Sequence, residues 1–236
     1  MNNQELADII EMQGQALAEW ALARMYEDPF WDARFGERGR RFSREDGLTH
    51  VRYLAEALRS SGDTIVKYAR WLQTLVTSRG ICTRHIDQNF ARLSEAIARE
   101  VDDSAAAQEL LTSARAALAY PAEGPTAHAR KVQDASAAIA KAWHESLAGK
   151  PAPSRDDLET LVSYLADALA AGKSAVLVDH MKWAVPFFAQ RGVPAARWRE
   201  AFAGLGRVLS AHLPSDAAAA TSGVLAAVEE VLQPLA

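Results

Sequence analysis

Apolar side chains recur along this chain every three or four residues, the spacing that gathers them on one face of an α-helix. In the first half, the pattern predicts four long helices whose apolar stripes are carried by Leu6, Ile9, Ile10, Leu17 and Trp20; by Val51, Leu54 and Leu58; by Ile65, Leu72 and Val76; and by Ile86, Phe90, Leu93 and Ile97. Alternating β-branched runs, which indicate strands, do not occur. The pattern therefore predicts an all-α protein.

Glycine and proline mark the expected helix ends. Gly36 to Arg41 form a basic connector interrupted by glycine, and Gly80 adopts the left-handed C-cap conformation at little cost. The segment Tyr120 to Thr126, YPAEGPT, disfavours continuous helix. We expect it to separate a first helical unit, residues 1–120, from a second, residues 121–236.

The second half of the chain repeats part of the first. Tyr53 to Leu58 read YLAEAL, and Tyr164 to Leu169 read YLADAL. Further matches at nearly constant offset are Ser43 with Ser154, Trp71 with Trp183, Arg79-Gly80 with Arg191-Gly192, Phe90 with Phe202, and Leu93 with Leu205. Self-similarity of this kind predicts a tandem repeat of two roughly five-helix units, in which the paired apolar residues, both tryptophans included, are core.

Composition narrows the class of protein. The chain has 236 residues, of which 49% are hydrophobic and 24% charged, as in soluble globular proteins. The net charge of -4 argues against a nucleic-acid partner. Cys82 is the single cysteine, which excludes an intramolecular disulfide and suggests a reducing compartment. No apolar run approaches the roughly 18 residues of a membrane span, and the N-terminus lacks the features of a signal peptide. We therefore expect a cytoplasmic protein without a membrane partner.

Most catalytic signatures are missing from the sequence. It contains no glycine-rich phosphate loop, no HExxH, no paired CxxC and no nucleophile elbow. The six histidines include no pair spaced to share a helix face, so a histidine metal site is not indicated. We expect neither an enzyme nor a metal protein.

Asp46 is the candidate binding residue with the richest surroundings. Asp46 and Asp157 precede the two YLA(E/D)AL segments at the same distance, and a helix-start carboxylate often has a structural role. Alternatively, Asp46 accepts hydrogen bonds from a ligand, because only the first copy has aromatic and basic residues upstream: Trp31, Phe35, Arg38, Arg40 and Arg41. Such residues suit a flat conjugated ligand that bears carboxylates. The arginines also fit a solvated basic connector.

His50 lies near an apolar stripe and is either a partly buried or solvated side chain or an axial ligand of a haem iron. Its repeat partner is Leu161, so the repeated unit does not require it. Cys82 follows Gly80 without an activating motif and is expected to be inert.

The stretch from Ser43 to Gly80 resembles the central helices of phycobiliproteins. Val51-Arg52-Tyr53, Ser61-Gly62-Asp63 and Arg79-Gly80 fall at the intervals of that family's Leu-Arg-Tyr, Ala-Gly-Asp and Leu-Gly motifs. The segment FGERGRR, from Phe35 to Arg41, is similar to bacterial phycobilin-related globins associated with bilin biosynthesis. More loosely, it is similar to helical modules that accompany cobalamin-binding domains.

This resemblance implies globin-like packing and a linear tetrapyrrole (bilin) as ligand. Asp46 would accept hydrogen bonds from pyrrole N–H groups. Ser43 stands where the family attaches its chromophore through cysteine, so a bilin would be held non-covalently, and Glu45 stands where the family has arginine. The candidate binding residues are Trp31, Phe35, Arg38, Arg41, Ser43, Asp46, His50 and Tyr53.

Two functions remain open from the sequence. The first is a non-enzymatic tetrapyrrole-binding protein, acting as carrier, sensor or chaperone, with a bilin as the first choice and haem or cobalamin as further ligands. The second is a ligand-free helical module for protein interaction or regulation. In that case the aromatic residues around Trp31 form an interface or core, and the chain pairs as a homodimer or binds another protein.

Overall fold

A computed structural model describes residues 1–147 and 151–233 of the chain. Within these ranges the protein consists of α-helices and one short 3-10 helix, and contains no β-strand. The all-α prediction is confirmed. None of the helices in the described ranges is both long and apolar enough to cross a bilayer.

The chain divides into two compact units. Unit 1 comprises Met1–Leu75 and His85–Leu118, and unit 2 comprises Val76–Arg84 and Ala119–Ala236. Unit 2 thus includes a short turn from the first half of the sequence. The boundary expected at residue 120 stays a prediction.

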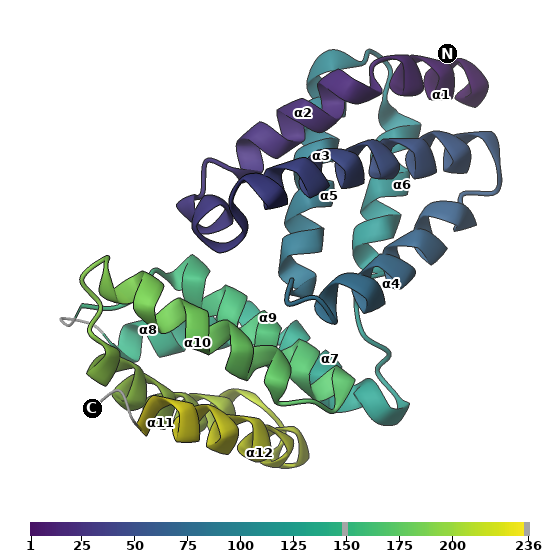
Figure 1. Cartoon of the computed structure of the whole chain (residues 1–236). Helices are drawn as coiled ribbons and strands as arrows, with labels where there is room; N and C mark the ends of the chain where they lie inside the picture. Colours follow the sequence, from purple (N-terminus) through teal and green to yellow (C-terminus); the bar gives the residue numbers. More distant parts are fainter. Residues whose placement is uncertain (148–150, 234–236) are drawn as a thin grey trace. The chain divides into compact units, whose positions relative to one another are not determined.

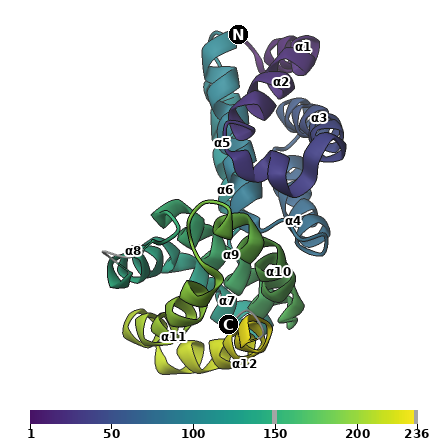
Figure 2. The same ribbon diagram turned by 60° about the vertical axis from the view of Figure 1, so that its left-hand side comes forward.

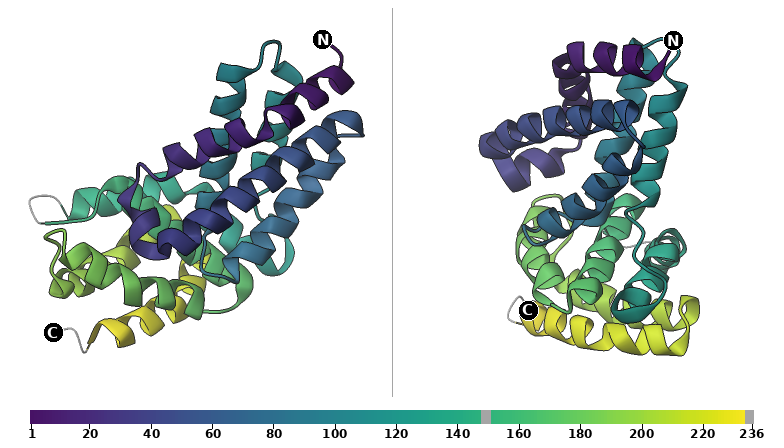
Figure 3. Two further views of the ribbon diagram at one scale, coloured as in Figure 1. Left: turned by 45° about the horizontal axis from the view of Figure 1, so that its top comes forward. Right: turned by 90° about the vertical axis from the view of Figure 1, so that its right-hand side faces the viewer.

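Helices α1 and α2 of unit 1 follow one another along α3 (Figures 1 and 3). The helices of the first half are α1 (Asn3–Met12), α2 (Gly14–Met25), α3 (Pro29–Arg59), α4 (Asp63–Thr77), α5 (Thr83–Glu100) and α6 (Ala105–Ala116). Glycine brings α2 and α3 close together, since a Cβ added at Gly47 would lie 3.1 Å from the Cβ of Ala18. A Cβ at Gly14 would likewise lie 3.1 Å from a methyl carbon of Val51.

Helix α3 begins earlier than the sequence pattern suggested. The Asp28 side chain accepts a hydrogen bond from the Phe30 amide, and Pro29 occupies the first helical turn. Gly36 interrupts the helix with φ 56° and ψ -157°, a conformation that favours glycine, and the helix then resumes. The expected connector over Gly36 to Arg41 is therefore wrong, apart from the kink at Gly36 itself. One consequence is that Asp46 lies inside a helix and not at its start.

The core of unit 1 follows the predicted stripes. Its fully buried members include Leu6, Ile10, Leu17, Val51, Leu54, Leu58, Ile65, Ile86, Phe90, Leu93 and Ile97. Ile9 and Trp20 are only half-buried, and Trp71 departs furthest, since 55% of its surface is exposed. The prediction that Trp71 is core is wrong, because it lies on the outer side of α4, away from the Ile65 and Leu72 stripe.

In unit 2, α9 is the central helix, and α7, α8 and α10 all pack against it (Figure 2). The elements are η1 (Gly124–Thr126), α7 (Ala127–Asp134), α8 (Ser136–Ser146), α9 (Arg155–Ala171), α10 (Ala175–Ala189), α11 (Ala195–His212) and α12 (Ser215–Leu232). Helix α12 packs beside α11 and also contacts α7, α9 and α10. Phe202 and Leu205 are buried, as expected of core residues, whereas Trp183, also predicted to be core, is only half-buried.

The start of α9 explains Asp157. The Ser154 hydroxyl accepts from the Asp157 amide at 3.1 Å, and the Asp157 carboxylate accepts from the Ser154 amide at 2.9 Å. This reciprocal arrangement is a capping box. The structural explanation of Asp157 is therefore confirmed, whereas Asp46, in mid-helix, has a different environment.

The described part of the first half contains six α-helices, and so does the described part of the second half, against an expectation of about five for each. The extra helix arises because each opening segment breaks in two. Gln13 separates α1 from α2 with φ -89° and ψ 2°, and Ala135 separates α7 from α8 with φ -92° and ψ 0°. Helices α4 and α10 each have 15 residues, and α5 and α11 each have 18.

Candidate functional site

A buried histidine lies at the centre of unit 1. The Nδ1 of His50 on α3 lies 2.6 Å from the hydroxyl of Tyr68 on α4, in hydrogen-bond distance. Both side chains are buried, and the His50 ring also contacts Phe90 at a centroid distance of 5.3 Å. Burial lowers the pKa of His50 to about 4, because the protonated ring would lose its hydration. His50 is therefore neutral at physiological pH.

Tyr68 and two further rings lead from this histidine to the surface. Tyr53 stacks on Tyr68 with ring centroids 3.9 Å apart and planes 15° apart, and Trp71 follows at 5.9 Å from Tyr68. Tyr53 is 38% exposed and Trp71 is 55% exposed. Each helix contributes residues one turn apart, which places their side chains on one face. We call Tyr53, Tyr68 and Trp71 the aromatic surface of unit 1.

Asp46 adds negative charge to this region. Its side chain is exposed, and its carboxylate lies close enough to act on Tyr68. Burial, followed by the charge of Asp46, raises the pKa of the Tyr68 hydroxyl, which stays protonated. The structure thus brings Asp46, His50 and Tyr53 together around Tyr68.

Trp31 and Phe35 belong to a separate aromatic cluster. Trp31 is buried, and its ring lies 5.7 Å from Phe35, 5.4 Å from Phe30 and 4.9 Å from His85. Tyr26 completes the cluster at 6.0 Å from Trp31. These rings pack on one another as in a small core. Of the two alternatives that the sequence left for the residues around Trp31, interface or core, this packing corresponds to a core.

Arg38 and Arg41 lie on exposed helix surface. Their guanidinium groups sit over the exposed ring of Phe42, at 5.5 Å and 5.1 Å from its centroid. This is a cation–π arrangement. Neither arginine lines the hollow described next.

A shallow hollow between α2, α3 and α5 contains two of the predicted site residues, Ser43 and His50. Its space of about 220 Å³ includes open solvent and encloses almost no cavity, and its lining residues are Ala18, Ala21, Leu22, Ser43, Gly47, His50, Asn89 and Leu93. Ligand pockets usually hold about 300–1,000 Å³. A tetrapyrrole therefore does not fit the hollow as these helices stand.

Unit 2 contains a ring stack of matching geometry. Tyr164 on α9 stacks on His180 of α10 at 3.9 Å and 22°, and Trp183 lies 5.8 Å from His180. Unlike Tyr53, Tyr164 is fully buried. Its hydroxyl donates to the backbone carbonyl of Gly80 at 2.8 Å. The turn Val76–Arg84 therefore covers in unit 2 the ring that is exposed in unit 1.

The same turn is held by a buried carboxylate. Asp167 accepts from the amide of Thr83 at 2.8 Å, from its hydroxyl at 2.6 Å and from the Tyr120 hydroxyl at 2.6 Å. Burial raises the pKa of Asp167 to about 6, although these three donors favour the charged form. Arg84 adds an ion pair to Glu159 at 3.1 Å and another to Asp156.

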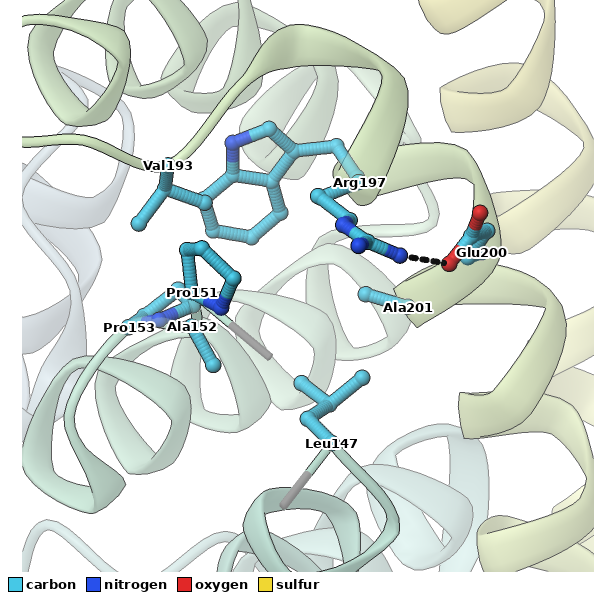
Figure 4. Close-up of a pocket in the computed structure, with 9 residues that line it drawn as sticks. Leu147, Pro151, Ala152, Pro153, Val193, Arg197, Glu200 and Ala201 are labelled. Atoms are coloured by element: carbon cyan, nitrogen blue, oxygen red, sulfur yellow. Dashed lines mark hydrogen bonds and ion pairs between the residues drawn. The ribbon is translucent and has the colours of Figure 1, made fainter. Parts of the chain in front are cut away.

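Unit 2 also has a small apolar pocket (Figure 4). It holds about 260 Å³, including space open to solvent, and is lined by Leu147, Pro151, Ala152, Pro153, Val193, Arg197, Trp198, Glu200 and Ala201. Arg197 and Glu200 form an ion pair at its edge, 2.8 Å long. The indole nitrogen of Trp198 is buried and finds no hydrogen-bond partner in the described part of the chain. The enclosed part of this space is about 10 Å³, which has room for no more than about one water molecule.

Sequence reasoning missed Tyr68 and misplaced Trp71. The available signal was the alignment of Tyr68 with His180, two rings at matching positions.

Cys82 is fully buried. Among the residues with described positions, no three His, Cys, Asp or Glu side chains are grouped to hold a metal ion. No protein-family model matches the chain, and no curated protein or solved structure shows significant similarity to it.

Proposed function

We propose that this chain is a helical protein-interaction module that binds a protein partner through the aromatic surface of unit 1. The observation that carries the proposal is the contrast between Tyr53 and Tyr164. Tyr164 is buried under the turn Val76–Arg84, whereas Tyr53 is 38% exposed in the same kind of stack. A polypeptide turn thus covers the Tyr164 stack of unit 2, and the Tyr53 stack of unit 1 presents a similar surface that a polypeptide could bind.

The chemistry of this surface suits a protein interface. Tyrosine and tryptophan are enriched among the residues that dominate binding energy, because they bury large apolar area and still offer a polar tip. Stacking on Tyr68 holds the Tyr53 ring in place before a partner arrives. A preformed surface loses less side-chain entropy on binding.

The proposal includes the tandem repeat, with six α-helices in each copy instead of about five. Its support comes from the YLAEAL and YLADAL segments, the equal lengths of α4 and α10 and of α5 and α11, and the two ring stacks. Under this hypothesis the second copy shows how the repeated surface is used.

Site-specific photo-crosslinking tests the proposal. A photoreactive amino acid replaces the exposed Arg70, beside Trp71, in the full chain expressed in its native cells. We expect a protein adduct that is reduced at least about tenfold when Trp71→Ala is added, because interface tryptophans often contribute 2 kcal/mol or more.

The matched control places the photoreactive residue at Met12, which is 78% exposed on α1. It should give no adduct of the same mass. If the yield of the adduct at position 70 is unchanged by Trp71→Ala, or if no adduct forms, the proposal is contradicted.

The tetrapyrrole hypothesis is a second candidate, favoured by the hollow that joins Ser43 to the neutral His50. Because the hollow is small, binding would require α2, α3 and α5 to move apart. Globin-like packing stays a prediction. Of the possible ligands, a linear bilin, haem and cobalamin all absorb visible light, so one measurement covers them.

Purified protein is mixed with biliverdin, haemin or cobalamin, and its visible spectrum is recorded after gel filtration. Binding predicts a co-eluting absorption band that Asp46→Asn shifts or bleaches for a bilin while the helical circular dichroism stays unchanged. Elution of all three pigments away from the protein contradicts this candidate and leaves the interaction hypothesis intact.

A further inference from the structure

Unit 2 carries two turns of the same construction. The first contains Arg79-Gly80 and the second Arg191-Gly192, and the glycines have φ of 82° and 86°. The amide of Ile81 bonds to the carbonyl of Val76 at 3.1 Å, and the amide of Val193 bonds to that of Phe188 at 3.0 Å. The first turn leads into α5 and the second into α11.

The first turn is docked on α9. The Tyr164 hydroxyl binds the Gly80 carbonyl, and the Asp167 carboxylate binds the amide and hydroxyl of Thr83 at the start of α5. The amide of Arg84 donates to the Ser163 hydroxyl at 3.1 Å. As a result Cys82 is fully buried and Thr83 is only 4% exposed.

The second turn is partly exposed. Gly192, Pro194 and Ala196 all face solvent, although Pro194 and Ala196 correspond by position to Cys82 and Arg84. Val193, between them, is buried and lines the pocket of Figure 4, so the turn is open to a partner through Gly192, Pro194 and Ala196.

Helix α3 offers the counterpart of the α9 surface. Tyr53 and Glu56 occupy the places in YLAEAL that Tyr164 and Asp167 occupy in YLADAL. Tyr164 and Asp167 are 0% and 1% exposed, whereas Tyr53 is 38% exposed and Glu56 faces solvent. Each chain therefore has one partly exposed turn and one exposed helix face that match a pair already in contact within unit 2.

We propose that the turn Arg191–Ala196 of one chain docks on the Tyr53–Glu56 face of α3 in a second copy, so that copies associate head to tail. This inference rests on the proposed interaction function and names the partner as the chain itself. The Tyr53 hydroxyl donates to the Gly192 carbonyl of the second copy. The Glu56 carboxylate faces the first backbone amides of α11 in the second copy, where a negative charge is favourable.

Such a contact uses different surfaces on the two molecules. It is therefore heterologous, and repeated contacts produce either a closed ring or an open chain. An isologous dimer, by contrast, would pair the same surface on both molecules. This difference allows a decisive mixing experiment.

Two variants each remove one side of the contact. Tyr53→Glu replaces the hydroxyl donor on α3 with a carboxylate, which repels the Gly192 carbonyl of the second copy. Ala196→Trp adds a bulky side chain to the turn, which prevents it from docking. Analytical ultracentrifugation of the wild type should show assembly that grows with concentration, and each variant alone should stay monomeric. Circular dichroism checks that both remain folded, and Glu56→Arg replaces Tyr53→Glu if the latter does not fold.

Mixing the two variants restores one intact contact. The Tyr53→Glu chain supplies its normal turn, and the Ala196→Trp chain supplies its normal α3 face. We expect a one-to-one heterodimer that grows no further. Monomers in the mixture, or a wild type that is monomeric at all concentrations, overturn the inference.

These outcomes also separate the inference from the proposed function. If the wild type stays monomeric while the crosslink at position 70 still depends on Trp71, the interaction function stands and its partner is a different protein. If the crosslink is also absent, both fall.

A gain-of-function pair gives an independent check. Arg84 forms ion pairs with Asp156 and Glu159 on α9, and the position of Asp156 corresponds to the exposed Glu45 on α3. Ala196→Arg should therefore lower the concentration at which assembly occurs by a few-fold, and Ala196→Glu should raise it. The shift should shrink at high salt, because exposed ion pairs are screened. Equal effects of the two substitutions contradict the docking geometry.

Discussion

His50 and Asp167 are titratable side chains whose burial makes stability depend on pH, with opposite signs. His50 is buried beside Tyr68 in unit 1, and Asp167 is buried under the turn Val76–Arg84 in unit 2. Burial disfavours the charged form of each, which lowers the pKa of the histidine and raises that of the carboxyl.

For His50, the folded pKa of about 4 lies below the unfolded value of 6.5. The unfolded chain therefore binds more protons between these values, and the contribution of His50 to stability is lost as pH falls through that window. The change amounts to about 3 kcal/mol. Urea unfolding of wild type and His50→Gln should show a stability difference that shrinks from pH 7 to pH 4.5. A difference independent of pH would contradict the burial of a neutral His50.

For Asp167, the folded pKa of about 6 lies above the unfolded value of 3.8. The folded protein binds the extra proton, so this contribution is fully present below pH 3.8 and is lost as pH rises through 6. The difference in unfolding free energy between wild type and Asp167→Asn should therefore fall by about 2 kcal/mol from pH 4 to pH 8. A difference that grows with pH would show that the donors around Asp167 outweigh its burial.

At the scale of the helix, small residues determine how closely α2 and α3 pack. Gly47 leaves only 3.1 Å between its missing Cβ and that of Ala18, whereas Gly206 in α11 has no atom within 4 Å of its Cβ position. Close helix packing therefore requires glycine at position 47 but not at position 206.

Gly47→Leu should destabilise the protein by about 1–3 kcal/mol, because the larger side chain forces α2 and α3 apart. Gly206→Ala is the matched control and should stabilise by about 0.5–1 kcal/mol, since alanine is the better helix former and has room. Thermal and urea unfolding measure both. If Gly47→Leu proves neutral, the close approach of the two helices is not as described.

The matched tyrosines Tyr53 and Tyr164 give a test at the scale of the whole molecule. Tyr164→Phe leaves the Gly80 carbonyl without its donor in a buried contact and should cost about 1–3 kcal/mol. Tyr53→Phe alters an exposed hydroxyl and should change the stability of the monomer by less than about 0.5 kcal/mol. Unfolding measured at low protein concentration compares the two. Equal losses would mean that the hydroxyls have equivalent surroundings.

The helical class and the core could be predicted from the sequence because they depend on local spacing. Leu54, Ile65 and Phe90 are buried where periodicity placed them, and Gly80 has the left-handed conformation expected of a helix end. The start of α3 at Pro29 was less predictable, since the polar stretch after Gly36 carries a weak apolar stripe, and helix continues through it.

Which of the two tyrosines in these similar hexapeptides is covered was decided by tertiary structure alone. Tyr53 and Tyr164 stand in nearly identical hexapeptides, yet one is exposed and the other fully buried. The difference comes from the turn at Gly80, which is distant from Tyr164 in sequence and bonded to it in space. Periodicity records which face of a helix is apolar, whereas long-range packing decides what lies against that face.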